Sequence, residues 1–362
     1  MSGFSAFMAI GHISCAIPSS LFNNPFGHGA TEVEKNNSHA IPSHCLGPEK
    51  GLRVVHKYGP CSPFGLKKST AVSSQILAQD DRRVQVIYSG VYNRRAEYND
   101  KSEVAGTYMV DTLHIEDEYE IPKFVFLCAA HVEGNFDDAN GILGLGPAST
   151  GYGGSNAFTS QTAAMFHKVF CYCLPRLEDS KGYVHFGDKA RENCPFSGSY
   201  TPLLKDTSDP NFYYVNLIAI TIGQKRVNIG TSSGVSSPRT ILDSGTVITR
   251  LPSSVYSELR SEFKGLMSKY PPVPPLDNVL DTCYNLEGYG KPEIPTMVLH
   301  FKNLDLNLDE TAVTWKANGT SQVCLAFAET DGLAIIGNHQ HQKRNMLYNI
   351  PDQRVEIGPG NC

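Results

Sequence analysis

One short loop in the sequence carries the residue types that acid–base chemistry needs. Asp243, Ser244, Gly245 and Thr246 follow one another between two short runs of isoleucine, leucine and valine. Gly245 lets the backbone turn tightly, and the two hydroxyl groups can hydrogen-bond a carboxylate or neighbouring backbone groups. The apolar flanks are expected to bury the loop. The same four residues also make an ordinary exposed turn, so the loop alone leaves both interpretations open.

Two apolar runs that end in glycine add context to this loop. The run 333–337 (LAIIG) lies downstream of it, and a similar run, 141–146 (GILGLG), occurs earlier in the chain. In each lobe of the pepsin-like aspartic proteases, an Asp-Thr/Ser-Gly loop is crossed by a strand that ends in such a run. The chain therefore resembles that family.

The resemblance extends over nearly everything from residue 52 to residue 362, and it is to the nepenthesin-type members of plants. The similar stretches are 52–63 (LRVVHKYGPCSP) to their propeptide, 98–113 to their flap hairpin, 170–175 (FCYCLP) to FSYCLP, and 281–284, 322–327 and 361–362 to their C-terminal lobe.

This resemblance implies an all-β, bilobed, pepsin-like acid protease fold with an incomplete N-terminal lobe and an intact C-terminal lobe. The expected segments are 1–50 as a degraded leader, 51–95 as a propeptide-like segment, 96–176 as a partial N-terminal lobe with the flap, 177–198 as an inter-lobe connection, and 199–362 as the C-terminal lobe. It also implies that Asp243 is catalytic, with Ser244, Gly245 and Thr246 forming the active-site loop. The implied flap residues are Tyr98, Asp100 and Ser102.

The chain departs from the family at one place that decides its chemistry. Family members carry a first DTGS loop ahead of the flap, whereas Asp243 is the only aspartate here that precedes Ser or Thr and then Gly. Asp111 and Thr112 are followed by Leu113 and belong to the second strand of the flap. The stretch 73–87, ahead of the flap, has the pattern of an amphipathic helix instead. We therefore expect the first half of the N-terminal lobe to be deleted.

The missing loop bears directly on function. The family hydrolyses peptide bonds with two neighbouring carboxylates that share one proton, and only one of them is encoded here. The resemblance thus implies an aspartic-type endopeptidase family member that lacks activity in this form, with a polypeptide substrate or partner protein in its cleft. Three alternatives stay open. The chain is a non-catalytic binding or inhibitor-like protein, as plant glycanase inhibitors with this fold are; two chains each supply one Asp243; or the reading frame lacks an exon.

The cysteines point to an oxidising compartment. The chain has ten cysteines, none in a CxxC pair, and two N-x-S/T sequons at 36–38 and 318–320. The resemblance implies a disulfide between Cys283 and Cys324. We propose a second one between Cys173 and Cys362. The usual partner of Cys128 is expected to be lost with the deleted segment. The resemblance also implies the secretory pathway, extracellular or vacuolar, although residues 4–22 make a poor signal peptide.

Other features exclude several classes of protein. A net charge of −5 gives no electrostatic footprint for nucleic acid, and no run is long and apolar enough for a membrane span. His339 and His341 lack an evident third ligand, so we predict surface positions, no metal and no cofactor. Trp315 is predicted to be a packing or rim residue. We expect a monomer.

The elements that must hold the loop are mostly short strands. The runs 107–115, 122–130, 182–187, 212–223 and 296–301 are rich in β-branched and aromatic residues and are bounded by Gly, Pro, Asn and Asp. After Pro252, apolar residues recur every four positions from Val255 to Met267, which predicts one helix that ends before Pro271. Many strands with a rare helix indicate a sandwich or barrel.

Overall fold

The chain was analysed as a computed structural model. It describes residues 103–115, 119–133, 143–147, 156–176, 181–194, 198–205, 210, 212–229, 239–317 and 319–362, together with the short strands β1 (Ser5–Ala6), β2 (Leu52–Val54) and β3 (Ala96–Glu97). The expected helix at 73–87, the flap residues Tyr98, Asp100 and Ser102, and both asparagines of the sequons lie outside the described residues.

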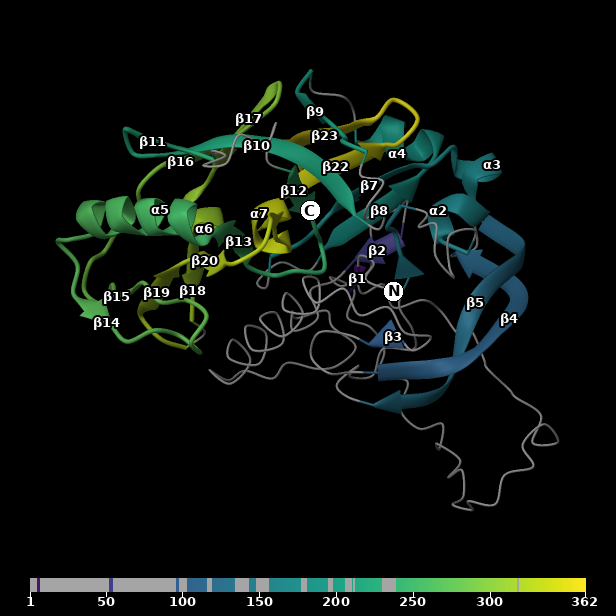
Figure 1. The fold of residues 1–362 in the computed structure, drawn as a ribbon, viewed down its shortest axis with the longest axis horizontal. Helices are drawn as coiled ribbons and strands as arrows, with labels where there is room; N and C mark the ends of the chain where they lie inside the picture. Colours follow the sequence, from purple (N-terminus) through teal and green to yellow (C-terminus); the bar gives the residue numbers. More distant parts are fainter. Residues whose placement is uncertain are drawn as a thin grey trace, which may run out of the picture.

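A six-stranded sheet joins segments from across the whole chain (Figure 1). In spatial order its strands are β2, β8 (Gly182–Phe186), β7 (Val169–Cys173), β22 (Arg344–Asn349), β23 (Arg354–Pro359) and β9 (Tyr200–Pro202). β7 pairs antiparallel with β22, so that Phe170 lies opposite Tyr348. The pairing brings residues near 170 beside residues near 345. The strand β8 and the helix α4 (Asp188–Asn193) lie within the segment 177–198, the expected inter-lobe connection.

A second, eight-stranded sheet holds the strands around Asp243. Its strands run in the order β17 (Leu304–Leu308), β16 (Met297–Phe301), β10 (Tyr213–Ile222), β12 (Arg239–Leu242), β21 (Ala334–Ile336), β13 (Thr249–Pro252) and β20 (Phe327–Thr330), with β11 (Lys225–Asn228) added on β10. The predicted helix is α5 (Ser253–Leu266), and its buried face carries Val255, Leu259 and Phe263, as the four-residue spacing requires.

A four-stranded sheet completes the C-terminal part. It consists of β14 (Pro272–Val273), β15 (Cys283–Asn285), β19 (Gln322–Leu325) and β18 (Thr314–Lys316). The short helix α6 (Glu310–Val313) directly precedes β18, and the short helix α7 (Asn338–His341) follows β21. Within the described part of the chain, no helix has the length and apolar character that crossing a bilayer would need.

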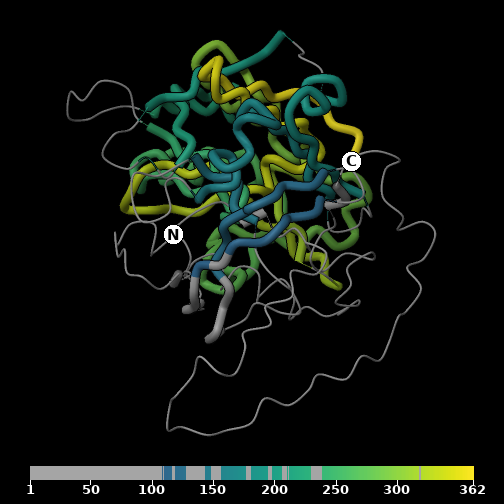
Figure 2. The backbone as a smooth tube through the Cα atoms, turned by 90° about the vertical axis from the view of Figure 1, so that its right-hand side faces the viewer, coloured from purple at the N-terminus to yellow at the C-terminus, as the bar shows by residue number. Residues whose placement is uncertain are grey.

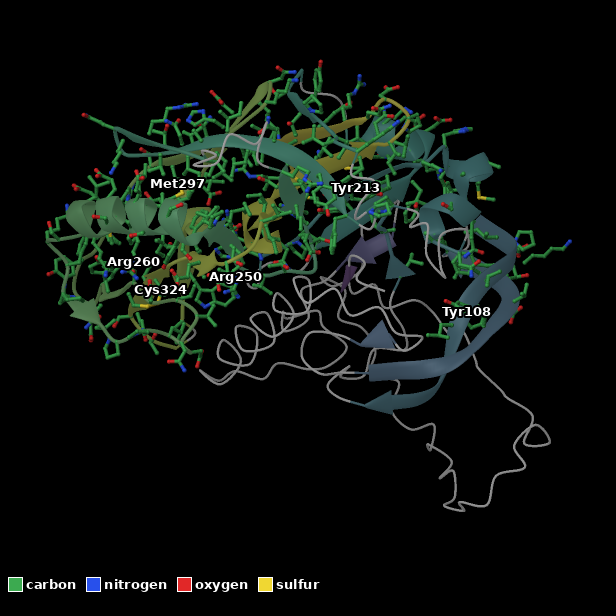
Figure 3. The ribbon with its side chains drawn as sticks, viewed as in Figure 1. Tyr108, Tyr213, Arg250, Arg260, Met297 and Cys324 are labelled. Carbon is green, nitrogen blue, oxygen red and sulfur yellow. A yellow bond between two sulfur atoms is a disulfide. The ribbon has the colours of Figure 1, made fainter. Side chains whose placement is uncertain are left out.

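The N-terminal part is dominated by one long hairpin. β4 (Glu103–Ile115) and β5 (Tyr119–Glu133) pair antiparallel over most of their length, and β3 adds a short third strand (Figures 1 and 2). Strand β6 (Leu143–Gly144) and the short helices α2 (Phe158–Gln161) and α3 (Ala163–Phe166) follow. The side-chain amide of Gln161 bonds both the N–H of Val125 (2.7 Å) and its carbonyl oxygen (2.8 Å), as a neighbouring strand would. Tyr108, on β4, lies far from Cys324 at the other end of the molecule (Figure 3).

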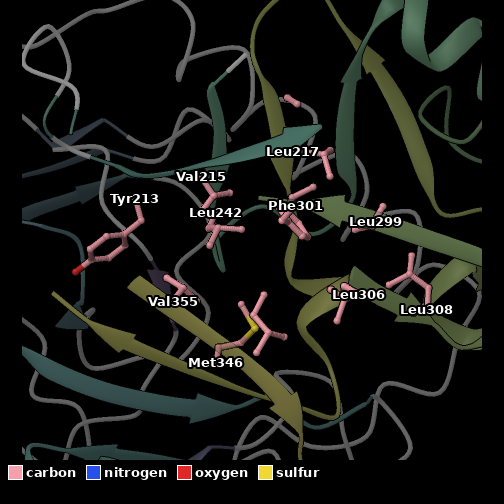
Figure 4. Packing of buried hydrophobic residues seen from close by; sticks show 14 of the residues in the cluster. Tyr213, Val215, Leu217, Leu242, Leu299, Phe301, Leu306, Leu308, Met346 and Val355 are labelled. Carbon is pink, nitrogen blue, oxygen red and sulfur yellow. The ribbon is translucent and has the colours of Figure 1, made fainter. Parts of the chain in front are cut away.

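One apolar core runs beneath the Asp243 loop. It joins Val215 and Leu242 of the eight-stranded sheet to Met346 and Val355 of the six-stranded sheet (Figure 4). All four side chains are buried. The loop therefore rests on packing that ties the two sheets together, and it cannot shift without disturbing both.

Three disulfides join described residues. Cys283 faces Cys324 across β15 and β19, and Cys173 is joined to Cys362; both are pairs that the family resemblance implied. The third, Cys171–Cys194, was not expected, because the family stretch FSYCLP has serine at the position of Cys171. It ties β7 to the C-terminal end of α4. The side chain of Cys128 lies outside the described residues.

Removing the Cys171–Cys194 disulfide should destabilise the chain by about 3 kcal/mol. The two cysteines are 23 positions apart, and the unfolded chain gains entropy when this loop is no longer closed. The double variant Cys171→Ser/Cys194→Ser and the wild type are compared by denaturant unfolding. The matched control is Cys283→Ser/Cys324→Ser, which opens a longer loop of 41 residues and should cost slightly more. An unchanged free energy of unfolding in the first variant would contradict the expectation.

Candidate active site

Three strands bring the Asp243 loop and the glycine-ending run together. β21 pairs parallel with β12, placing Ile335 opposite Ile241, and it also meets β13 at Arg250. Strand β21 thus lies between the two strands that lead into and out of the loop. Because β12 and β21 are parallel, their carboxyl ends share one edge of the sheet, and the Asp243 N–H donates to the carbonyl of Ile336 (3.1 Å).

Gly337 allows this close approach. A Cβ atom at this position would lie 2.5 Å from the carbonyl oxygen of Val247, a backbone atom that cannot move aside as a side chain can. Two loop carbonyls then accept the N–H groups that begin α7: Asn338 donates to Thr246 (2.6 Å) and His339 to Val247 (3.1 Å). The final glycine of the LAIIG run therefore has a physical reason, which is the contact of α7 with the loop.

The loop holds its own carboxylate. Oδ1 of Asp243 accepts a hydrogen bond from the N–H of Gly245 (2.8 Å), and Oδ2 accepts one from the hydroxyl of Thr246 (2.7 Å). The side-chain amide of Asn338 donates to the carbonyl of Ser244 (3.0 Å). Asp243 is 2% exposed and Thr246 is fully buried. The loop is therefore not an exposed turn, and its carboxylate is fixed in one orientation.

A layer of tyrosines connects the loop to the six-stranded sheet. The hydroxyl of Tyr172 lies 3.1 Å from Nδ1 of His341 and 3.4 Å from the hydroxyl of Tyr348. Burial raises the pKa of Tyr172 and of Tyr348, and the negative charge of Asp243 contributes to both rises. The ring of Tyr213 packs on that of Tyr348, with centroids 4.7 Å apart. These hydroxyls are therefore neutral neighbours of the Asp243 loop.

The prediction that His339 and His341 lie at the surface is wrong. His341 is 1% exposed and His339 is 9% exposed. The prediction rested on the lack of an evident third metal ligand, but α7 is buried and its polar groups find partners there. Nε2 of His339 lies 3.0 Å from the carbonyl of Thr314, and the Gln340 side chain donates to the carbonyl of Ala312 (2.7 Å). No cluster of three potential metal ligands occurs among the residues described.

Sequence reasoning predicted the Asp243 loop of this site and missed the contact of Tyr172 with His341. Asp243, Ser244, Gly245 and Thr246 form the loop that the pattern indicated, whereas the predicted flap residues lie outside the described part of the chain. Tyr172 lies in the FCYCLP stretch, so the stretch had been singled out, but nothing in it indicated contact with residues near 341.

Replacing His341 by glutamine should flatten the dependence of stability on pH. Burial, with the nearby charge of Arg344, lowers the pKa of His341 from 6.5 to about 3, so the folded state keeps this ring neutral in moderate acid. The unfolded state protonates it near pH 6.5, and stability must therefore fall as pH falls from about 6.5 to about 3. Between pH 7 and pH 4 the wild type should lose about 2–3 kcal/mol more than His341→Gln.

Denaturant unfolding at several pH values measures this difference, since every other titrating group is common to both proteins. Parallel stability curves for the two proteins would contradict a neutral, buried His341.

Two family models match the chain. The model described as "Xylanase inhibitor C-terminal" matches residues 212–359, and the one described as "Xylanase inhibitor N-terminal" matches residues 74–188. The second match begins ahead of the described hairpin and ends within the segment that contains β8 and α4.

Similar curated proteins come from plants. An aspartyl protease family protein of Arabidopsis thaliana is 34% identical over 272 residues, which are 74% of this chain and 54% of that protein. The Arabidopsis aspartyl protease AED1 is 34% identical over 268 residues, 73% of this chain and 55% of its own length. Nepenthesin-2 of Nepenthes gracilis is 26% identical over 73% of this chain and 60% of its own length. The chain thus spans little more than half the length of the first two.

Solved structures support the fold. Conglutin gamma from lupine seeds superposes with a TM-score of 0.59 at 18% identity, covering 75% of this chain and 76% of that protein. The aspartic proteinase of Irpex lacteus gives a TM-score of 0.56 at 19% identity, covering 74% and 81%. The expected all-β, pepsin-like fold is confirmed. With the buried Asp243 loop crossed by a glycine-ending strand, these matches show that the chain belongs to the plant family of pepsin-like aspartic proteases.

Proposed function

We propose that this protein binds polypeptide at the Asp243 loop and, as a single chain, hydrolyses peptide bonds very slowly or not at all. The proposal rests on the number of Asp-Ser/Thr-Gly motifs in the sequence. Asp243 is the only aspartate in the sequence that is followed by Ser or Thr and then Gly. From this we infer that the first loop of the family, and with it the first half of the N-terminal lobe, is missing.

The chemistry of the family explains why one such loop is insufficient. Two carboxylates so close together cannot both ionise, so they share a proton; one activates the water as a base while the other protonates the carbonyl oxygen as an acid. A single carboxylate cannot hold both protonation states at once. The loss of one acid–base partner slows hydrolysis by roughly 10²–10⁴-fold, before the lost positioning of the water is counted.

Binding has different requirements. An extended peptide needs a shaped cleft and fixed hydrogen-bonding groups, and both can persist when turnover is lost. The loop that carries Asp243 keeps the hydrogen bonds from Gly245 and Thr246 that orient its carboxylate. The apolar core beneath it is continuous. These features support a retained ligand site in the C-terminal part of the chain.

The disulfides and the plant relatives indicate the secretory or vacuolar route. Within that route we propose an extracellular or vacuolar location. Disulfides form and persist along the oxidising secretory route.

Incubation with an unstructured protein at roughly pH 3 to 5, where a proton-sharing pair operates, should give no cleavage that a statine-type inhibitor suppresses. The same inhibitor should bind the purified chain, as measured by calorimetry. Asp243→Asn is the matched control, because asparagine keeps the size of the side chain and can still accept the Gly245 N–H. Inhibitor-sensitive cleavage that disappears in Asp243→Asn would refute the proposed inactivity.

A second candidate function is inhibition of a partner enzyme. It is favoured by the two matching family models, which are both described as xylanase inhibitor domains. Such a protein would need its surface loops and stable fold, and it would need no catalytic pair.

Under this second function, the purified chain should slow xylanases from a panel of fungal and bacterial sources in proportion to its concentration. Inhibition should disappear when the disulfides are reduced and the chain is unfolded, which serves as the control. An unchanged rate across the panel, together with binding of the statine-type inhibitor, would leave peptide binding as the function of the site.

A further inference from the structure

A buried cluster of polar side chains lies under the Asp243 loop. Tyr172 comes from β7, Tyr348 from β22, His341 from α7 and Ser244 from the loop itself, and none is more than 5% exposed. The hydroxyl of Tyr172 lies within hydrogen-bonding distance of Nδ1 of His341 and of the hydroxyl of Tyr348. This phenolic oxygen thus joins three elements, β7, α7 and β22.

The direction of each bond follows from the number of donors and acceptors. Nε2 of His341 is buried and has no partner. A buried N–H without an acceptor is rarer in proteins than an unfilled lone pair, so the proton of the neutral ring belongs on Nδ1. Nδ1–H then donates to the oxygen of Tyr172. The single hydroxyl proton of Tyr172 is left to donate to Tyr348.

We propose that Tyr172, held in place by the Nδ1–H of His341, is a positioning residue for the Asp243 loop. It acts through the helix α7, which begins at Asn338 and ends at His341. The side chain of Asn338 donates to the carbonyl of Ser244 in the loop. Tyrosine, helix and loop therefore form one chain of contacts that leads to the backbone carrying Asp243.

Loss of the Tyr172 hydroxyl should displace the Asp243 loop. Without this hydroxyl, the Nδ1–H of His341 loses its acceptor while it stays buried, a situation that proteins avoid. Tyr213 offers a matched comparison in the same layer of rings. Its hydroxyl donates to the carbonyl of Leu145 (2.9 Å), which lies outside this chain of contacts.

Trp315 provides a signal that requires no ligand. It is the only tryptophan in the chain, so its fluorescence is the sole tryptophan emission. Its ring lies 5.2 Å from that of His339, whose backbone N–H donates to the carbonyl of Val247 at the end of the loop. A displaced loop should therefore change the emission of Trp315 or its quenching by acrylamide.

The test compares Tyr172→Phe with Tyr213→Phe at roughly pH 5. Tyr172→Phe should shift the Trp315 signal, whereas Tyr213→Phe should lose stability without that shift. Tyr172→Phe should also weaken binding of a statine-type peptide about threefold to tenfold. This binding measurement alone rests on the proposed function. A fluorescence shift without any inhibitor binding by the wild type would reject the proposed function and retain the positioning role.

His341 supplies a second pair of variants and a measurement on the wild type. His341→Gln keeps an N–H donor for Tyr172 and should retain the Trp315 signal, whereas His341→Leu should reproduce the change seen in Tyr172→Phe. Nitrogen NMR of the wild type should show the Nδ1–H tautomer of His341 and should be readable even if a variant fails to fold. An Nε2–H tautomer, or equal Trp315 signals in Tyr172→Phe and Tyr213→Phe, would overturn the proposal.

Discussion

A buried carboxylate is the constraint on which the arrangement of the C-terminal part depends. Removing Asp243 from water is costly unless its oxygens are hydrogen-bonded, and the tight loop supplies those bonds from the backbone of Gly245 and the hydroxyl of Thr246. The loop's own carbonyls then need donors, which the start of α7 provides. That contact is possible only because residue 337 has no side chain. One polar group thus determines the conformation of two segments that lie far apart in the sequence.

The same requirement continues into the six-stranded sheet. Tyr172 brings a hydroxyl into the buried region, where it contacts Nδ1 of His341 and the hydroxyl of Tyr348. His341 and Tyr348 add two further polar groups, each of which must also be accommodated without water. Because β7 and β22 are neighbours in this sheet, both tyrosines approach the loop from the same layer. The sheet therefore does more than connect the two parts of the chain, since it also carries the polar groups that face the site.

Local patterns predicted those parts of the structure that neighbouring residues determine. The Asp243 loop, the glycine-ending run and the helix at 253–266 were all visible, because turn residues and a four-residue spacing act over short distances. The contact of Tyr172 with His341 spans 169 positions and leaves no periodic signal. The burial of α7 was missed for a related reason. The surface positions were inferred from the lack of a third metal ligand, and a local pattern does not show the tertiary partners that satisfy buried polar side chains.

The chemistry of the loop also explains how the fold and the proposed loss of activity can coexist. The N–H of Gly245 and the hydroxyl of Thr246, both within the loop, donate hydrogen bonds that orient the Asp243 carboxylate. Catalysis by a proton-sharing pair, in contrast, depends on an interaction between two carboxylates. A chain can therefore keep the loop, the crossing strand and the core while losing the reaction. The fold alone then carries no information about turnover, which depends on a second acid beside Asp243.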